Sequence, residues 1–199
     1  MIKAVIFDMG GVLVRTEDRV PRTALGARYG LSYEQMDALV FNSESAMQAM
    51  VGAIPEEEHW RSVTGRLKVP QEAIEEFRTA FWAGDRADQE LTALIDSLRP
   101  RYRSALLSNA WSNARRDIGE AYNILRVFDI IIFSAERGLA KPDPRIYQHA
   151  LDLLKIQPEE AVFVDDMPVN VEAAQAVGIH GIRFLNTQQT KNEVLALIQ

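Results

Sequence analysis

The sequence predicts an α/β protein built on a parallel sheet of five strands, with an all-helical segment inserted after the first strand. Its apolar residues gather in short runs with little polar alternation, which is typical of strands buried on both faces of a parallel sheet. Helical patterns separate the later runs, and this alternation indicates β-α-β units. The 199 residues, of which 47% are hydrophobic, suffice to bury a core without cross-links.

Five apolar runs are expected to form the strands: Ile2–Phe7, Ser104–Leu107, Ile130–Phe133, Ala161–Val164 and Gly181–Phe184. Four segments carry apolar residues at the spacing of an amphipathic helix and are expected to cover the sheet: Glu90–Leu98, Pro144–Leu154, Val169–Val177 and Asn192–Ile198. Strand and helix therefore alternate through the second half of the chain.

The segment from Thr16 to Asp85 interrupts this alternation because it has no convincing strand pattern. Ser32 and Pro70 are start signals for helices within it. The helices expected here are Arg19–Tyr29, Ser32–Phe41, Ser45–Met50, Pro55–Arg66 and Pro70–Trp82. We therefore expect a core domain formed by residues 1–15 and 86–199, and a helical cap domain formed by residues 16–85.

The composition excludes several kinds of site and partner. No cysteine is present, which excludes disulfides, thiolate metal sites and cysteine nucleophiles. The net charge of −6 and the pI of about 5.2 argue against nucleic acid or an anionic membrane as a partner. The first apolar run is too short for a signal peptide or a transmembrane span. We expect a cytoplasmic protein, either a monomer or a homodimer.

Polar and acidic residues stand where the apolar runs end. Asp8 follows the first run, Ser108 and Asn109 follow the second, and Asp165 and Asp166 follow the fourth. Because ligands bind beyond the carboxyl ends of the strands in an open parallel sheet, we expect these residues to meet at one edge. Adjacent carboxylates repel each other unless a cation offsets their charge, and Mg²⁺ prefers carboxylate oxygens.

Each of these signals alone has a simpler interpretation. Asp8 with Gly10 and Gly11 is also a common turn sequence, although two glycines let backbone N–H groups face an anion. Adjacent aspartates also begin helices. A lone lysine such as Lys141, in the loop after the third run, is usually solvated. The occurrence of all the signals in order, at or near successive strand ends, favours a site for a cation and a phosphate group.

These residues resemble the four motifs of the haloacid dehalogenase-like hydrolase superfamily, in the branch whose helical cap follows the first motif. The resembling segments are Val5–Leu13, Ala105–Asn109, Lys141–Tyr147 and Val162–Asn170, followed by Glu172–Ala174 and Gly178. The resemblance covers essentially the whole chain, and the cap is its least specific part. It implies a Rossmann-like core and a phosphatase-type hydrolase for a small phosphorylated metabolite, with sugar phosphates among the substrates to consider.

The resemblance also implies the catalytic and metal-binding roles. Asp8 would attack phosphorus and form an aspartyl-phosphate, which water then hydrolyses. Mg²⁺ would be held by Asp8, by the backbone carbonyl of Gly10 and by the aspartate pair. Within the pair, Asp166 is expected to bind the ion directly, and Asp165 directly or through water.

The same resemblance implies the substrate-binding residues. Ser108, Asn109 and Lys141 would hold the transferring phosphoryl group, and Lys141 would also take part in catalysis by offsetting its charge. The backbone at Gly11 is expected to face the phosphate, and Trp111 is expected at the rim of the substrate pocket.

Gly10 departs from the common pattern of the superfamily, in which a second aspartate at this position acts as general acid and base. General acid–base catalysis contributes about 10²–10⁴-fold, and its loss would hurt poor leaving groups most. Water, Asp165 or a carboxylate of the cap would then have to supply the proton. Alternatively, the substrate has a good leaving group, such as the anomeric oxygen of a sugar 1-phosphate, or the protein is a weak enzyme. Some phosphatases of the superfamily also have Asp-x-Gly.

The cap is expected to close over the phosphate and select the substrate. The candidates for lining the pocket are Phe41, Asn42, Glu44, His59, Trp60 and Trp82. Aromatic residues at helical spacing more often form the core of such a cap, and His59 is expected at the surface because three glutamates precede it.

Two other functions remain open. A 2-haloacid dehalogenase would use Asp8 against carbon without a metal, but that chemistry has no need of the Asp165–Asp166 pair. A phosphate-binding regulator, in which Gly10 marks the loss of the general acid, would bind a phosphorylated metabolite without turning it over.

Overall fold

The computed structural model describes residues 1–198, and within them one parallel sheet of five strands forms the centre of the protein. The strands lie in the order β5-β4-β1-β6-β7, and every neighbouring pair is parallel. Their bounds are β1 (Ala4–Phe7), β4 (Arg103–Ser108), β5 (Ile130–Phe133), β6 (Ala161–Asp165) and β7 (His180–Arg183). This topology confirms the predicted α/β class and the Rossmann-like core.

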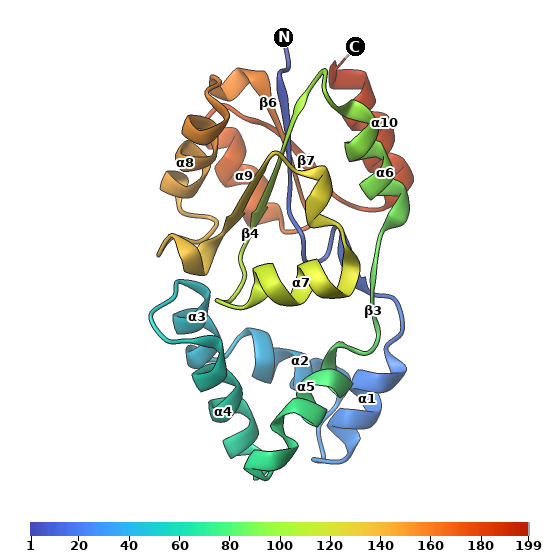
Figure 1. Cartoon of the computed structure of the whole chain (residues 1–199), viewed down its shortest axis with the longest axis vertical. Helices are drawn as coiled ribbons and strands as arrows, with labels where there is room; N and C mark the ends of the chain where they lie inside the picture. Colours follow the sequence, from blue (N-terminus) through green and yellow to red (C-terminus); the bar gives the residue numbers. More distant parts are fainter. Residues whose placement is uncertain (199) are drawn as a thin grey trace.

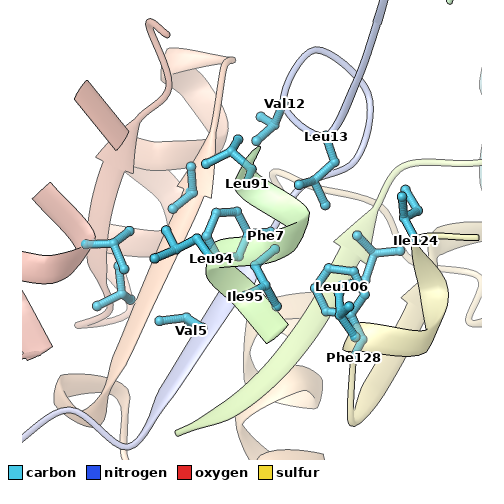
Figure 2. Close-up of a cluster of buried hydrophobic side chains, with 14 of the residues drawn as sticks. Val5, Phe7, Val12, Leu13, Leu91, Leu94, Ile95, Leu106, Ile124 and Phe128 are labelled. Carbon is cyan, nitrogen blue, oxygen red and sulfur yellow. The ribbon is translucent and has the colours of Figure 1, made fainter. Parts of the chain in front are cut away.

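Helices cover both faces of the sheet (Figure 1). On one side lie α6 (Gln89–Leu98) and α10 (Thr187–Ile198), and on the other lie α8 (Pro144–Leu154) and α9 (Pro168–Ala176). Figure 2 shows Leu91, Leu94 and Ile95 of α6 over Val5 and Phe7 of β1. Ala4 and Ile6, which alternate with them along β1, belong to a separate buried apolar cluster that also contains residues of α8 and α9. Because both faces of β1 are buried, its sequence is apolar without alternation.

The helical insertion leaves and rejoins the core through two short antiparallel strands, β2 (Val14–Thr16) and β3 (Asp85–Ala87). The helices between them are α1 (Val20–Ala27), α2 (Tyr33–Phe41), α3 (Glu44–Met50), α4 (Glu56–Arg66) and α5 (Ile74–Trp82). We call residues 16–85 the cap. Figure 1 shows the cap beneath the carboxyl ends of the strands, where the predicted site lies.

Several elements differ from the sequence prediction. The strands β2 and β3 were not predicted, and neither was α7 (Ala114–Tyr122), which lies between the sheet and the cap. The last helix begins at Thr187, five residues before the predicted start. Single turns of 3₁₀ helix fill several connections: η1 (Gln71–Ala73), η2 (Leu125–Val127), η3 (Ser134–Glu136) and η4 (Pro158–Glu160). No helix within residues 1–198 has both the length and the apolar character needed to cross a membrane.

Candidate active site

Asp8 lies one residue beyond the end of β1, at the centre of the sheet edge. Its backbone N–H donates to the Val164 carbonyl of β6 at 2.8 Å, so the carboxylate is held beside the end of that strand. Its Oδ1 accepts a hydrogen bond from the Met9 backbone N–H at 2.6 Å. Only 7% of Asp8 is exposed. The parallel register places Phe7 beside Leu106, so Asp8 and Ser108 leave neighbouring strands close together.

Lys141 connects Asp8 to Asp165. Its Nζ lies 2.8 Å from Asp8 Oδ1 and 2.6 Å from Asp165 Oδ2, and its side chain is completely buried. Asn109 holds the backbone of this lysine from both sides, because Nδ2 donates to the Lys141 carbonyl at 2.9 Å and Oδ1 accepts from the Lys141 N–H at 2.8 Å. The loop after β5 is therefore tied to the end of β4, and the ammonium group is fixed between two carboxylates.

The two adjacent aspartates have different surroundings. Besides the Lys141 ammonium, Asp165 accepts from the Met167 N–H at 2.8 Å and from Asn170 Nδ2 at 3.1 Å, so protein donors engage both of its oxygens. Asp166 is partly exposed, and its carboxylate lies against Gly11. Asn170 had no role in the sequence prediction, although its place in the first turn of the helix that follows Asp165 was a signal for such a contact.

The clustering of these carboxylates perturbs their titration. Burial raises the pKa of Asp8 to about 7, the Lys141 ammonium opposes this shift, and the Asp165 carboxylate adds to it. Burial, and then the charge of Asp165, also raise the pKa of Asp166. One ligand atom from each of Asp8, Asp165 and Asp166 can be chosen so that all lie within 4.8 Å of one another. Three carboxylates so arranged are a donor set for a hard divalent cation, whose charge would offset their repulsion.

The two glycines after Asp8 have opposite environments. Gly11 has a φ of +80°, and a Cβ added there would overlap the Asp166 carboxylate, so the position of that carboxylate requires glycine. Gly10 is exposed, and a Cβ there would meet no atom within 4 Å. Open space therefore lies beside Asp8 where a second aspartate would stand. The three carboxylates, with the room that Gly11 leaves for one of them, fit Mg²⁺.

The structure thus brings Asp8, Lys141, Asp165 and Asp166 into one cluster, with Asn109 joined to it through Lys141. Trp111 lies elsewhere. It is 9% exposed and packs among aromatic side chains of the cap rather than at an open rim. A contact between Trp111 and a substrate stays a prediction.

The cap residues divide into core and surface. Trp60 is 1% exposed and belongs to the cap's apolar cluster, as its helical spacing predicted, whereas Phe41 and Trp82 are half-buried at the edge of the cluster. Asn42 and Glu44 are exposed.

The prediction that His59 lies at the surface was wrong. Its exposure is 0%, Nδ1 lies 2.9 Å from Ser45 Oγ, and burial lowers its pKa to about 4. The preceding glutamates misled the prediction because they occupy the first turn of α4, where acidic residues are favoured irrespective of burial.

Comparisons with known proteins find similar sequences. A sequence model described as haloacid dehalogenase-like hydrolase matches residues 2–178. A sesquiterpene phosphatase of Aspergillus oryzae is 28% identical over 98% of this chain and 96% of its own length. A phosphorylated carbohydrates phosphatase of Thermotoga maritima is 29% identical over the whole chain and 91% of its own length. Acyl-CoA dehydrogenase family member 10 of Mus musculus is 30% identical over 98% of this chain, which matches only 19% of that longer protein.

A solved structure shares the fold. A HAD family enzyme from Bacteroides thetaiotaomicron, in complex with magnesium and inorganic phosphate, superposes with a TM-score of 0.77 at 22% identity. The match covers 92% of this chain and 94% of that one.

Proposed function

The chain belongs to the haloacid dehalogenase-like hydrolase family, and from this premise we propose that it is a Mg²⁺-dependent phosphate-monoester hydrolase working through an aspartyl-phosphate on Asp8. The observation that carries the proposal is the Asp8 carboxylate held by the Lys141 ammonium beside the Asp165–Asp166 pair. The phosphatases of Aspergillus oryzae and Thermotoga maritima support it, because each aligns with nearly the whole chain.

In the first step, an oxygen of Asp8 forms a bond to phosphorus and the bond from phosphorus to the alcohol oxygen breaks. Lys141 supports this attack because its ammonium favours the ionised form of a carboxylate whose pKa burial raises. The same ammonium faces the phosphoryl group and offsets its charge. In the second step, water attacks phosphorus, releases inorganic phosphate and regenerates the Asp8 carboxylate.

Asp165 and Asp166 would divide their work. Asp165 is a positioning residue, because its oxygens orient Lys141 and accept hydrogen bonds from the Met167 N–H and the Asn170 side chain at the start of α9. Asp166, with Asp8 and the Gly10 carbonyl, would hold Mg²⁺. When bound, the ion would supply charge neutralisation for the phosphoryl group. This division favours Asp166 as the direct ligand.

The departing alcohol needs a proton, and among residues 1–198 the site offers no obvious side chain to donate it. Gly10 leaves open space where a general acid would stand, and Asp165 is engaged by protein donors. Water in that space, or a good leaving group, therefore best accounts for turnover. We propose a small phosphorylated metabolite as the substrate, and sugar phosphates, including 1-phosphates, belong in the first screen because the Thermotoga maritima relative is named for phosphorylated carbohydrates.

The test is hydrolysis of an aryl phosphate with and without Mg²⁺. We expect turnover that a chelator and Asp8→Asn both abolish. Asp143→Asn is the matched control, because Asp143 lies in the Lys141 motif but its carboxylate pairs with the exposed Arg145 outside the site. Hydrolysis that survives removal of Mg²⁺ would refute the metal-dependent mechanism, and turnover of a 2-haloacid without Mg²⁺ would favour dehalogenation. No turnover across sugar phosphates, nucleotides and phosphoglycolate would favour a binding regulator.

A further inference from the structure

We propose that Trp111 is a positioning residue through which docking of the cap holds the phosphate-binding end of β4 in place. This inference depends on the proposed function, because it takes Ser108 and Asn109 as phosphate ligands. It adds a specific mechanical link between those ligands and the cap.

Trp111 belongs to the core by its place in the chain and to the cap by its packing. Within residues 1–198, it is the only member of the cap's apolar cluster that lies outside the cap. Its ring centroid lies 4.4 Å from that of His59, 5.7 Å from that of Trp60 and 5.9 Å from that of Phe41, with which it stacks. The indole N–H donates to the Ala46 carbonyl at 3.3 Å. The side chain is therefore inserted into the cap.

The residues on either side of Trp111 are also joined to the cap. Ser112 Oγ accepts a hydrogen bond from the Glu56 backbone N–H at 3.2 Å. Asn113 donates its backbone N–H to a carboxylate oxygen of Glu56 at 3.2 Å and its side-chain amide to Glu57 at 2.7 Å. Glu56, which makes two of these contacts, is 4% exposed, whereas Ser112 and Glu57 lie at the surface. Three consecutive core residues thus contact α3 or α4.

A second path leads through Ala110. Its backbone N–H donates to Ser134 Oγ at 2.9 Å, and that hydroxyl lies 2.6 Å from the Met50 carbonyl at the end of α3. The segment 110–113 is therefore attached to the cap at every residue, directly or through Ser134. Ser108 and Asn109 come directly before this segment, and Asn109 holds the Lys141 backbone by two hydrogen bonds.

The consequence is a short rigid connection between the cap and the phosphate site. A cap that moved away on this side would have to withdraw the Trp111 ring from its aromatic partners or pull the end of β4 with it. Cap docking and the geometry of Ser108 and Asn109 are then coupled. Coupling between two equilibria is reciprocal, so bound phosphate should favour the docked cap to the same extent.

The experiment compares Trp111→Ala with Phe77→Ala. Phe77 is also buried in the cap's apolar cluster, 3% exposed, but its aromatic neighbours are Tyr29 and Trp60 rather than Trp111. Both changes remove a large ring from the same cluster, so a simple loss of cap packing would affect both variants alike. The readouts are the inhibition constant of inorganic phosphate with Mg²⁺ and the hydrogen exchange of α3 and α4 with and without phosphate.

We expect Trp111→Ala to raise the inhibition constant of phosphate about tenfold, within the usual range of coupling between sites, and Phe77→Ala to change it less than about twofold. Trp111→Phe, which keeps a ring in the cluster, should recover most of the affinity. Phosphate should slow exchange in α3 and α4 of the wild type and of Phe77→Ala, but not of Trp111→Ala.

An unchanged inhibition constant in a folded Trp111→Ala would overturn the inference. If that variant does not fold, the wild type decides, since exchange in α3 and α4 that ignores bound phosphate is equally fatal. Either failure leaves the proposed function intact as long as Mg²⁺-dependent hydrolysis is seen. Loss of hydrolysis in the wild type would instead refute the proposed function itself.

Discussion

The substitution Gly11→Ala tests how the fold places Asp166. A Cβ at this position would lie 2.5 Å from Asp166 Cγ and 2.8 Å from its Oδ1, whereas non-bonded carbon atoms pack at about 3.5–4.0 Å. The carboxylate must therefore move by about 1 Å, several times the roughly 0.2 Å tolerance of metal–ligand distances. The φ of +80° adds a conformational cost of about 1–2 kcal/mol for any residue with a Cβ.

Two measurements follow from this geometry. The Mg²⁺ concentration for half-maximal hydrolysis of an aryl phosphate should rise about 10–100-fold in Gly11→Ala, as for other losses of support around a metal ligand. The free energy of unfolding, measured by denaturant without Mg²⁺, should fall by about 1–2 kcal/mol.

Gly10→Ala is the matched control for this substitution, because a Cβ there meets no atom within 4 Å. The substitution also keeps the backbone carbonyl at this position. Its unfolding free energy should change by about 0.5 kcal/mol or less, and its Mg²⁺ response far less than that of Gly11→Ala. If Gly11→Ala has the Mg²⁺ response of the wild type, or if both variants lose Mg²⁺ affinity equally, the Asp166 carboxylate does not bind the ion from its position against Gly11.

Three further predictions use other parts of the site and the cap. Gly10→Asp fills open space beside Asp8, so it should speed hydrolysis of alkyl phosphates more than that of aryl phosphates, whereas equal effects would count against a missing general acid. Asp166→Asn should raise the Mg²⁺ requirement, while Asp165→Asn should chiefly lower kcat at saturating Mg²⁺ by releasing Lys141; the reverse pattern would exchange their roles. Because burial lowers the pKa of His59 from 6.5 to about 4, the unfolded chain binds this proton first, so stability should fall by at most about 3 kcal/mol as the pH drops from 6.5 to 4. His59→Gln should remove that part of the slope in denaturant titrations, and an unchanged slope would contradict the shift.

The arrangement of the candidate site followed from topology that the sequence reveals. Asp8, Ser108 and Asp165 each end a continuous apolar run, and such runs form parallel strands whose carboxyl ends share one edge. Conversely, β2 and β3 were missed because they are three residues long and partly polar, so that their pairing depends on the cap they enclose. The helix α7 was missed because its apolar residues are few.

The contacts between residues 110–113 and the cap could not be predicted from the sequence for a different reason. Glu56 belongs to a run of acidic residues, a pattern typical of an exposed first helical turn. It nevertheless accepts hydrogen bonds from Trp60 and Asn113 and pairs with Arg78 at 2.9 Å. Trp111 likewise packs with residues about 30 to 70 positions earlier in the chain. Such contacts arise from tertiary packing, and no local pattern encodes them.

The central position of β1 also governs the order in which the protein can assemble during synthesis. β1 pairs with β4 and β6, so Asp8 leaves the ribosome about 160 residues before Asp166. At 5–20 residues per second, this interval is about 8 to 30 s. The cap's apolar cluster is complete earlier, except for Trp111, because its other members lie between Leu25 and Trp82. The cap can thus collapse while β1 is still without partners, and the arrival of Trp111 joins it to a sheet that is only then beginning to form.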